Sequence, residues 1–146
     1  MVSEEIEKHR EGAEVYAGDD IGREKSVELL DEIELPNGLL PLKDILEVGY
    51  NRSTGFVWLI QKNQAEHKFK AANRLVWYNK VVTAFVEKRK MRKVTGVKAK
   101  ELLIWVSIED IYVEEKDLGT VTFSNSLTGI SRSFPTSAFQ LEEVYK

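Results

Sequence analysis

The chain has 146 residues, of which 42% are hydrophobic and 31% charged, as is typical of a folded globular protein of one domain. Its formal net charge is only −3, and it contains no cysteine, which excludes disulfides, thiol nucleophiles and thiolate metal sites. No stretch approaches the roughly 20 apolar residues of a transmembrane helix.

The charges are unevenly distributed along the chain. Residues 1–34 contain 12 acidic and 4 basic side chains, a net charge of −8. Residues 62–100 contain 12 basic side chains against Glu66 and Glu87, a net charge of +10. This asymmetry indicates that the basic part either binds an anionic partner or is neutralised by the acidic part.

Residues 1–22 are expected to form an acidic N-terminal extension. Ser3 followed by two glutamates is a helix start signal for residues 3–17, although Gly12 weakens that helix. The stretch lacks the basic start and apolar core of a signal peptide, so we expect a cytoplasmic protein.

A stronger helix is predicted over residues 23–34, where apolar residues recur at helical spacing. Asp19 or Asp20 can cap its start, and Pro36 prevents its continuation. The sequence LPNGLLP at 35–41 predicts a rigid turn, and its leucines are expected to be buried against the helix.

From residue 42 onward the pattern changes to short strands separated by turn signals. We predict strands at 43–49, 56–61, 66–72, 75–87, 101–108, 120–124 and 130–134, with Ala138 to Val144 as a last strand or tail. We also expect bulges near Asn79 and at Glu109–Asp110. The chain is therefore predicted to be an α+β, mainly β protein. We expect residues 23–146 to form one domain. Its part at 42–144 is expected to be a small antiparallel β-barrel-like structure, preceded by an N-terminal helix or helices.

The centre of this domain is expected between Gly96 and Ile108. The most apolar run of the chain lies there and comprises Leu102, Leu103, Ile104, Trp105, Val106 and Ile108. A run this rich in β-branched and aromatic residues predicts a strand that is buried on both faces. A buried helix is the alternative, which is disfavoured because Gly96 and the acidic pair at 109–110 confine the run to the length of a strand.

Three blocks of the sequence together form a specific pattern. They are LPNGLLPLKDILEVGYNRSTGFVWL at 35–59, TGVKAKELLIWVSIEDI at 95–111 and GISRSFPTSAFQLEE at 129–143. In this order they resemble the plant family called domain of unknown function 538, and the resemblance covers most of residues 23–143. It implies a β-barrel-like fold and roles in stress response or development. Two activities are associated with the family: lipid binding, through a kinship with bactericidal/permeability-increasing proteins, and an esterase-like activity on chlorophyll.

A serine hydrolase would need a nucleophile, a base and an orienting acid. The chain has two histidines, His9 and His67, and the serines that stand out are Ser131 and Ser133 in GISRSF. This segment differs from the GxSxG nucleophile elbow and lies in a predicted strand, so we expect the serines to line an exposed face. A dyad of His67 with one of the serines stays open as the alternative that an esterase would require.

No metal site and no cofactor are predicted. Without cysteine, and with two histidines far apart in sequence, metal ligands would have to be carboxylates. Adjacent acidic pairs include Asp19–Asp20, Glu109–Asp110, Glu114–Glu115 and Glu142–Glu143. Neighbouring residues on a strand point to opposite faces, so none of these is an obvious acid/base pair.

A compact basic cluster is the feature that best indicates a function. It consists of Lys88, Arg89, Lys90, Arg92 and Lys93, which Lys98 and Lys100 can extend, and which Lys68, Lys70, Arg74 and Lys80 would approach if strands 66–72 and 75–87 pair. Each lysine or arginine near an anionic membrane contributes roughly 1 kcal/mol of binding energy. The alternatives are a solvated hairpin that protects a sheet edge and a surface covered by the acidic N-terminal segment.

Lipid is favoured over nucleic acid as the anionic partner. The aromatic residues do not alternate with the basic ones, as a platform for base stacking would require. A barrel wall of such residues can enclose an apolar ligand, although a filled core is expected for a barrel this small. The sequence therefore predicts a non-enzymatic module that binds anionic or amphipathic lipid, such as a phosphoinositide at a membrane surface. An esterase-like hydrolase and a protein-interaction module are the alternatives.

Overall fold

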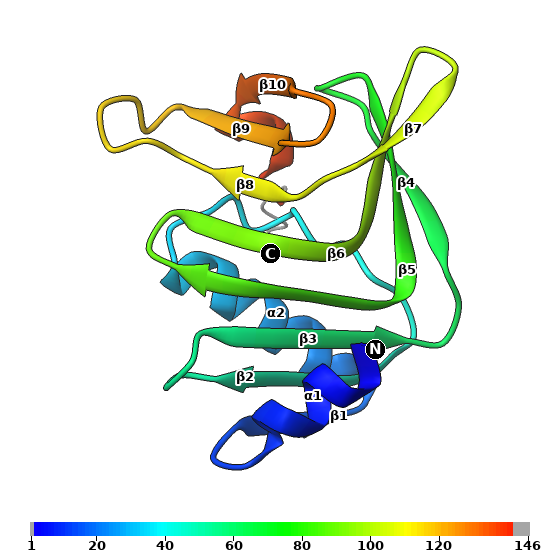
Figure 1. Cartoon of the computed structure of the whole chain (residues 1–146), viewed down its shortest axis with the longest axis vertical. Helices are drawn as coiled ribbons and strands as arrows, with labels where there is room; N and C mark the ends of the chain where they lie inside the picture. Colours follow the sequence, from blue (N-terminus) through cyan, green and yellow to red (C-terminus); the bar gives the residue numbers. More distant parts are fainter. Residues whose placement is uncertain (1, 142–146) are drawn as a thin grey trace, which may run out of the picture.

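The computed structural model describes residues 2–141, in which ten strands form one antiparallel sheet and two α-helices lie in the N-terminal part of the chain (Figure 1). The helices are α1 (Val2–Arg10), α2 (Asp19–Glu32) and the short 3-10 helix η1 (Thr136–Phe139). The strands are β1 (Glu14–Ala17), β2 (Ile45–Asn51), β3 (Phe56–Gln61), β4 (Ala65–Phe69), β5 (Arg74–Glu87), β6 (Lys90–Glu101), β7 (Ile104–Ser107), β8 (Asp110–Tyr112), β9 (Thr120–Asn125) and β10 (Ile130–Pro135). This confirms the predicted α+β, mainly β class. The main path of the sheet runs β1-β2-β3-β5-β6-β8-β9-β10 and does not close into a complete barrel.

The sheet is organised around the hairpin of its two longest strands, β5 and β6. One half of β5 pairs with β4 and the other half with β3, while β6 pairs with β8 near its start and with β7 near its end. Between the partners Tyr78↔Val97 and Thr83↔Thr95, residues 79–82 stand opposite Gly96 alone. This bulge confirms the one expected near Asn79, and the hairpin bends there, so that its two halves face in different directions (Figure 1).

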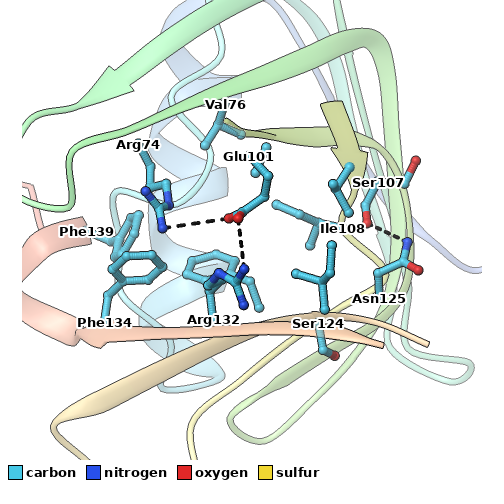
Figure 2. Close-up of a pocket in the computed structure, with 14 residues that line it drawn as sticks. Arg74, Val76, Glu101, Ser107, Ile108, Ser124, Asn125, Arg132, Phe134 and Phe139 are labelled. Atoms are coloured by element: carbon cyan, nitrogen blue, oxygen red, sulfur yellow. Dashed lines mark hydrogen bonds and ion pairs between the residues drawn. The ribbon is translucent and has the colours of Figure 1, made fainter. Parts of the chain in front are cut away.

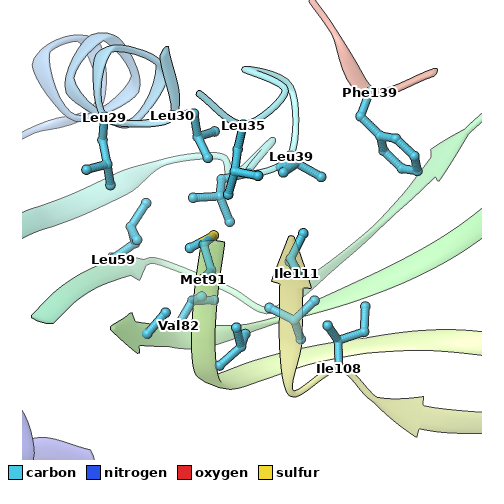
Figure 3. Close-up of a cluster of buried hydrophobic side chains, with 14 of the residues drawn as sticks. Leu29, Leu30, Leu35, Leu39, Leu59, Val82, Met91, Ile108, Ile111 and Phe139 are labelled. Carbon is cyan, nitrogen blue, oxygen red and sulfur yellow. The ribbon is translucent and has the colours of Figure 1, made fainter. Parts of the chain in front are cut away.

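The core lies between α2, the segment that follows it, and the concave face of the sheet. Figure 3 shows Leu30 of α2 and Leu35 and Leu39 of the following turn facing Val82 and Met91 of the β5–β6 hairpin. The leucines of the turn are buried, as predicted. A cavity of about 10 Å³ remains among these side chains, about the minimum that one water molecule needs, so this part of the interior is filled.

Replacement of Tyr78 by phenylalanine is expected to lower the free energy of unfolding by about 1–2 kcal/mol. The buried Tyr78 hydroxyl donates a hydrogen bond to the Leu39 carbonyl at 2.8 Å, and its removal leaves that oxygen without this partner. Burial also raises the pKa of the hydroxyl, so it stays a proton donor at neutral pH. Urea unfolding measures the loss, with Tyr112→Phe on the half-buried β8 as the control. Equal stabilities of the two variants would contradict the importance of this contact.

The N-terminal segment packs on the outer face of the sheet instead of forming one helix over residues 3–17. The helix ends at Arg10, and after Gly12 the chain continues as β1, which pairs antiparallel with β2.

The α2 helix begins at Asp19, earlier than predicted. The Asp19 carboxylate does not cap the helix. It accepts a hydrogen bond from the Ile45 N–H at 2.9 Å, which lowers the pKa of Asp19.

The predicted central strand at 101–108 is wrong. The β6 strand ends at Glu101, Leu102 and Leu103 form a two-residue turn, and β7 runs back along β6. Leu102 and Leu103 are 93% and 91% exposed, so the turn lies at the surface and not in the core. The apolar run contains no turn residue that would reveal the reversal. Ala138 to Val144 was predicted to be a last strand or a tail. Its described part contains no strand, because η1 occupies residues 136–139, and residues 142–144 lie outside the described part.

Candidate ligand-binding site

The structure distributes the predicted basic cluster over the β5–β6 turn and the start of β6. Lys88 and Arg89 approach the Glu34 carboxylate, which follows α2, at 3.7 and 3.1 Å. Arg92 approaches Glu87 at 3.4 Å. Part of the cluster is therefore paired with carboxylates, one of which belongs to the acidic segment 1–34. The surrounding surface has mixed charge, because the adjoining concavity is lined by Glu87, Asp110, Glu114 and Glu115 as well as by Lys88, Arg89 and Lys90.

Two further cations of the cluster lie over aromatic rings. The Lys90 ammonium is 6.0 Å from the centre of the Tyr112 ring, and that of Lys93 is 5.9 Å from the Phe85 ring. Lys98 and Lys100 lie beyond the bend at Gly96, on the half of β6 that pairs with β7, so they do not extend the cluster.

A more apolar site lies where β10 approaches the ends of β5 and β6 without pairing with either strand (Figure 2). We call it the seam pocket. Its apolar walls are Val76, Ala99, Val106, Ile108, Phe123, Ile130, Phe134 and Phe139, and its polar lining is Arg74, Glu101, Ser107, Ser124, Asn125 and Arg132. The space between its atoms is about 480 Å³, which includes open solvent at the mouth. About 40 Å³ of this space can hold water. The pocket is therefore narrow, and a bulky ligand would have to move the β9–β10 hairpin outward.

Three charged side chains bridge the seam from different strands. The Glu101 carboxylate of β6 accepts a hydrogen bond from Arg132 of β10 at 3.0 Å and lies 3.7 Å from Arg74 of β5 (Figure 2). Its side chain is only 15% exposed, while those of Arg132 and Arg74 are 45% and 32% exposed. Two partly exposed guanidinium groups thus share one carboxylate at the rim, which leaves a net charge of +1 beside an apolar pocket.

Aromatic rings line the pocket below this charged group. Phe139 of η1 lies 5.8 Å from Phe134 and 5.1 Å from Phe123, between ring centres. The Arg74 guanidinium lies 5.3 Å from the centre of the Phe134 ring. The Gly38 N–H donates to the Phe139 carbonyl at 2.8 Å, which ties η1 to the turn after α2. An antiparallel ladder joins β10 to β9, whereas side-chain contacts, and no strand ladder, join β10 to β5 and β6.

Strand alternation explains how β10 builds one wall of the pocket. Ile130, Arg132 and Phe134 line the pocket, so Ser131 and Ser133 project from the opposite face. The two serines were predicted as candidate site residues from the sequence, whereas Arg132 was not. An arginine between two apolar residues at period-two spacing was the signal that could have identified it. Glu101 was missed because it was assigned to the start of a strand that was predicted to be buried.

The structure does not bring His67 together with either serine. Ser133 exchanges a hydrogen bond with Thr122 at 2.8 Å, and Ser131 is exposed. His67 lies on β4, where its ring packs 4.5 Å from Phe69, between ring centres. Burial, together with the nearby Lys43, lowers the pKa of His67, so its imidazole is neutral at pH 7. His9, the second histidine, stacks on Phe56 at 4.3 Å, on the outer face of the sheet.

The described part of the chain shows neither a metal site nor a membrane-spanning helix. Within residues 2–141, no group of three or more histidine, cysteine, aspartate or glutamate side chains is arranged to hold a metal ion. In the same part of the chain, neither helix has the length and apolar character that crossing a membrane requires. The pair Glu142–Glu143 lies outside the described residues.

Comparison with known protein families gives a match. A family model described as "Protein of unknown function, DUF538" matches residues 26–140. This range contains both the basic cluster and every residue of the seam pocket, and it leaves out α1 and β1. No curated protein and no solved structure matches the chain.

Proposed function

Because the chain belongs to the family DUF538, whose description states no activity, we propose its function from the seam pocket: a non-enzymatic module that binds an amphipathic anion of the lipid class. The observation that carries the proposal is the position of Arg74 and Arg132 at the rim of an apolar pocket. An acyl chain would lie among the phenylalanines, and its anionic group would contact the two guanidiniums. Arginine suits this role because its planar donors match carboxylate and phosphate oxygens.

Glu101 supports the proposal because its carboxylate occupies the place that a ligand anion would take. It lies within 3.0 Å of Arg132 and 3.7 Å of Arg74, and it balances only one of their two positive charges. A bound phosphate would therefore meet both a residual positive charge and competition from this carboxylate. Removal of the negative charge on Glu101 should then strengthen anion binding, an effect opposite in sign to that of removing either arginine.

The proposal is tested with octyl phosphate, used as a monomer below its micelle concentration, and with octyl glucoside as a neutral ligand with the same tail. Octyl phosphate is expected to bind more tightly. Arg132→Gln should weaken its binding about tenfold or more, since a hydrogen bond to a charged group contributes about 1.5–3 kcal/mol. Glu101→Gln should strengthen it. Titration calorimetry measures both changes, with Arg23→Gln on the exposed face of α2 as the control.

Equal affinity for the two octyl ligands would refute the proposal, as would arginine and glutamate variants that bind like the native protein. Urea unfolding of each variant separates a change of binding from a loss of fold. A gain of affinity in Glu101→Gln is the most discriminating result, because a pocket that is merely part of the core would show no such gain.

The predicted anion-binding surface at Lys88, Arg89, Lys90, Arg92 and Lys93 stays a proposal alongside the seam pocket. Its support is the concentration of five cations within six residues, and its weakness is the carboxylates that already pair with Lys88, Arg89 and Arg92.

A role in stress or development, and a cytoplasmic location, remain predictions that come from the resemblance and from the sequence alone. The esterase alternative gains no support, since His67 is not hydrogen-bonded to Ser131 or Ser133.

A further inference from the structure

The outer face of the four strands β4, β5, β6 and β7 carries lysines and tryptophans in two adjacent rows. In one row, Lys68 of β4 lies opposite Leu75 of β5, and Lys100 of β6 lies opposite Trp105 of β7. The adjacent row runs across all four strands and consists of Glu66, Trp77, Lys98 and Ser107, in which each residue pairs with the one on the neighbouring strand. Alternation turns Val76, Ala99 and Val106 of the same strands toward the seam pocket. We call the outer side the lysine–tryptophan face. It consists of Lys68, Leu75, Trp77, Lys98, Lys100 and Trp105.

This face is positively charged and its cations are available. The Lys98 ammonium lies 5.3 Å from the centre of the Trp77 ring, and that of Lys100 lies 5.2 Å from the Trp105 ring. Within the described residues, Lys68, Lys98 and Lys100 form no ion pair, in contrast to Lys88, Arg89 and Arg92 of the basic cluster. Glu66 is the one acidic residue in the two rows. The face therefore complements a negatively charged surface.

The β6–β7 turn extends this face with exposed apolar side chains. Leu102 and Leu103 are 93% and 91% exposed, and the neighbouring Ile104 is 60% exposed. Leu102 also has φ +55°, a backbone conformation that glycine or asparagine adopts more easily in a two-residue hairpin turn. At one position the chain thus accepts both an exposed apolar side chain and backbone strain, a combination that points to a contact outside the chain.

We propose that the turn and the lysine–tryptophan face together form a membrane contact for a leaflet that contains anionic phospholipid. Leu102 and Leu103 insert among the acyl chains, Trp77 and Trp105 lie at the level of the headgroups, and the lysines contact the phosphates. Tryptophan is enriched at that level because its ring is apolar and its N–H is polar. The lysines favour a lipid surface over an apolar protein partner, because they surround the leucines with unpaired positive charge.

The contact also brings the seam pocket to the membrane, and in this respect the inference rests on the proposed function. Glu101 at the rim of the pocket directly precedes Leu102 in the turn. A turn inserted in the leaflet would therefore hold the rim of the pocket close to the headgroups, where a single-chain anionic lipid could enter it without crossing water.

The test is flotation of the full chain with phosphatidylcholine vesicles, with and without phosphatidylserine. The decisive variant combines Leu102→Gly with Leu103→Ser, which removes both apolar side chains and supplies the turn with the residue that its positive φ favours. We expect vesicle binding that is about tenfold weaker or more, since each fully buried leucine contributes about 1.5–3 kcal/mol, and an unfolding temperature at or above that of the native protein. Leu118→Ser is the matched control, because Leu118 is an exposed leucine in another turn.

A second readout locates the contact. Lipids brominated on their acyl chains should quench the fluorescence of Trp77 and Trp105, and the double change Trp77→Phe and Trp105→Phe should remove that quenching. Trp58 is fully buried and should not respond. The double change Lys98→Glu and Lys100→Glu should abolish the preference for phosphatidylserine vesicles.

Several results would overturn the inference. The turn variant could float as well as the native chain, or the native chain could ignore anionic vesicles at physiological salt. Vesicle binding could be lost only when the charges of the basic cluster are reversed, at Lys88, Arg89, Lys90, Arg92 and Lys93, which would assign the contact to that cluster. Sedimentation velocity could show that the turn variant instead dissociates a dimer, which would make the turn a contact between two copies. Octyl phosphate binding is measured without vesicles, so it succeeds or fails independently of these results.

Discussion

Replacement of Trp58 by alanine is expected to lower the free energy of unfolding by about 3–5 kcal/mol. Trp58 has no exposed surface, and its ring lies directly over Gly49 of the neighbouring strand. A Cβ atom at Gly49 would come within 2.1 Å of this ring, so the two residues fit each other closely. The indole N–H also donates a hydrogen bond to the Glu47 carboxylate at 2.7 Å. The Arg10 guanidinium of α1 lies 2.9 Å from the same carboxylate and 5.4 Å from the centre of the indole ring. The substitution therefore removes part of the surface on which α1 packs.

Urea unfolding measures this loss, and amide hydrogen exchange should show faster exchange in α1 than in the rest of the variant. The control is Trp77→Ala, which removes the same ring from the partly exposed outer face of β5 and should cost about 1 kcal/mol or less. A loss of similar size in both variants, or slow exchange in α1 of the Trp58 variant, would show that the indole does not anchor the helix.

Replacement of Gly96 by alanine is expected to lower the free energy of unfolding by about 2–4 kcal/mol. Two effects combine at this residue. Its φ of +83° lies in the region that glycine adopts without strain, and an added Cβ would meet the Val81 carbonyl oxygen at 2.3 Å. That oxygen belongs to the backbone, so relief requires movement of the bulge at which β5 and β6 bend.

Gly129 separates these two effects. It has a similar φ of +73°, but a Cβ added there meets no atom within 4 Å. Gly129→Ala should therefore cost only the strain of the left-handed conformation, about 1–2 kcal/mol. Thermal unfolding of the two variants side by side measures the difference. If Gly129→Ala were as destabilising as Gly96→Ala, backbone strain alone would account for both and the close approach of Val81 would be unimportant.

The parts of the fold that the sequence predicted well are those whose local signals agree with their environment. The strand at 56–61 is a continuous apolar run between turn residues, and the structure contains it at those bounds. The prolines and glycine of 35–41 predicted a turn with buried leucines, which was confirmed. At Leu102 and Leu103 the apolar residue type disagrees with the environment, because the two leucines form an exposed turn. The hydrophobic pattern therefore predicted burial where the chain reverses in solvent.

The candidate sites were less predictable because tertiary structure assembles them. Arg74, Glu101 and Arg132 come from three strands, and nothing local to any of the three indicates that they meet. The pairing of Lys98 with Trp77 and of Lys100 with Trp105 follows from strand register, which the sequence does not fix across the bend at Gly96. The basic cluster was visible as a run of like charges, but its pairing with Glu34 depends on how α2 ends.

The two ends of the open sheet bear on how this protein avoids aggregation. A strand at the border of a sheet exposes unpaired N–H and C=O groups, which can template the addition of further chains. Here β10 carries Arg132 and finishes at Pro135, and both residue types discourage such addition. On the other side the four-residue β1 covers β2, a longer strand in which Ile45, Val48, Gly49 and Asn51 are buried. A protease that cleaved in the loop before α2 would release this cover, and the exposed β2 would become a starting point for cross-β assembly.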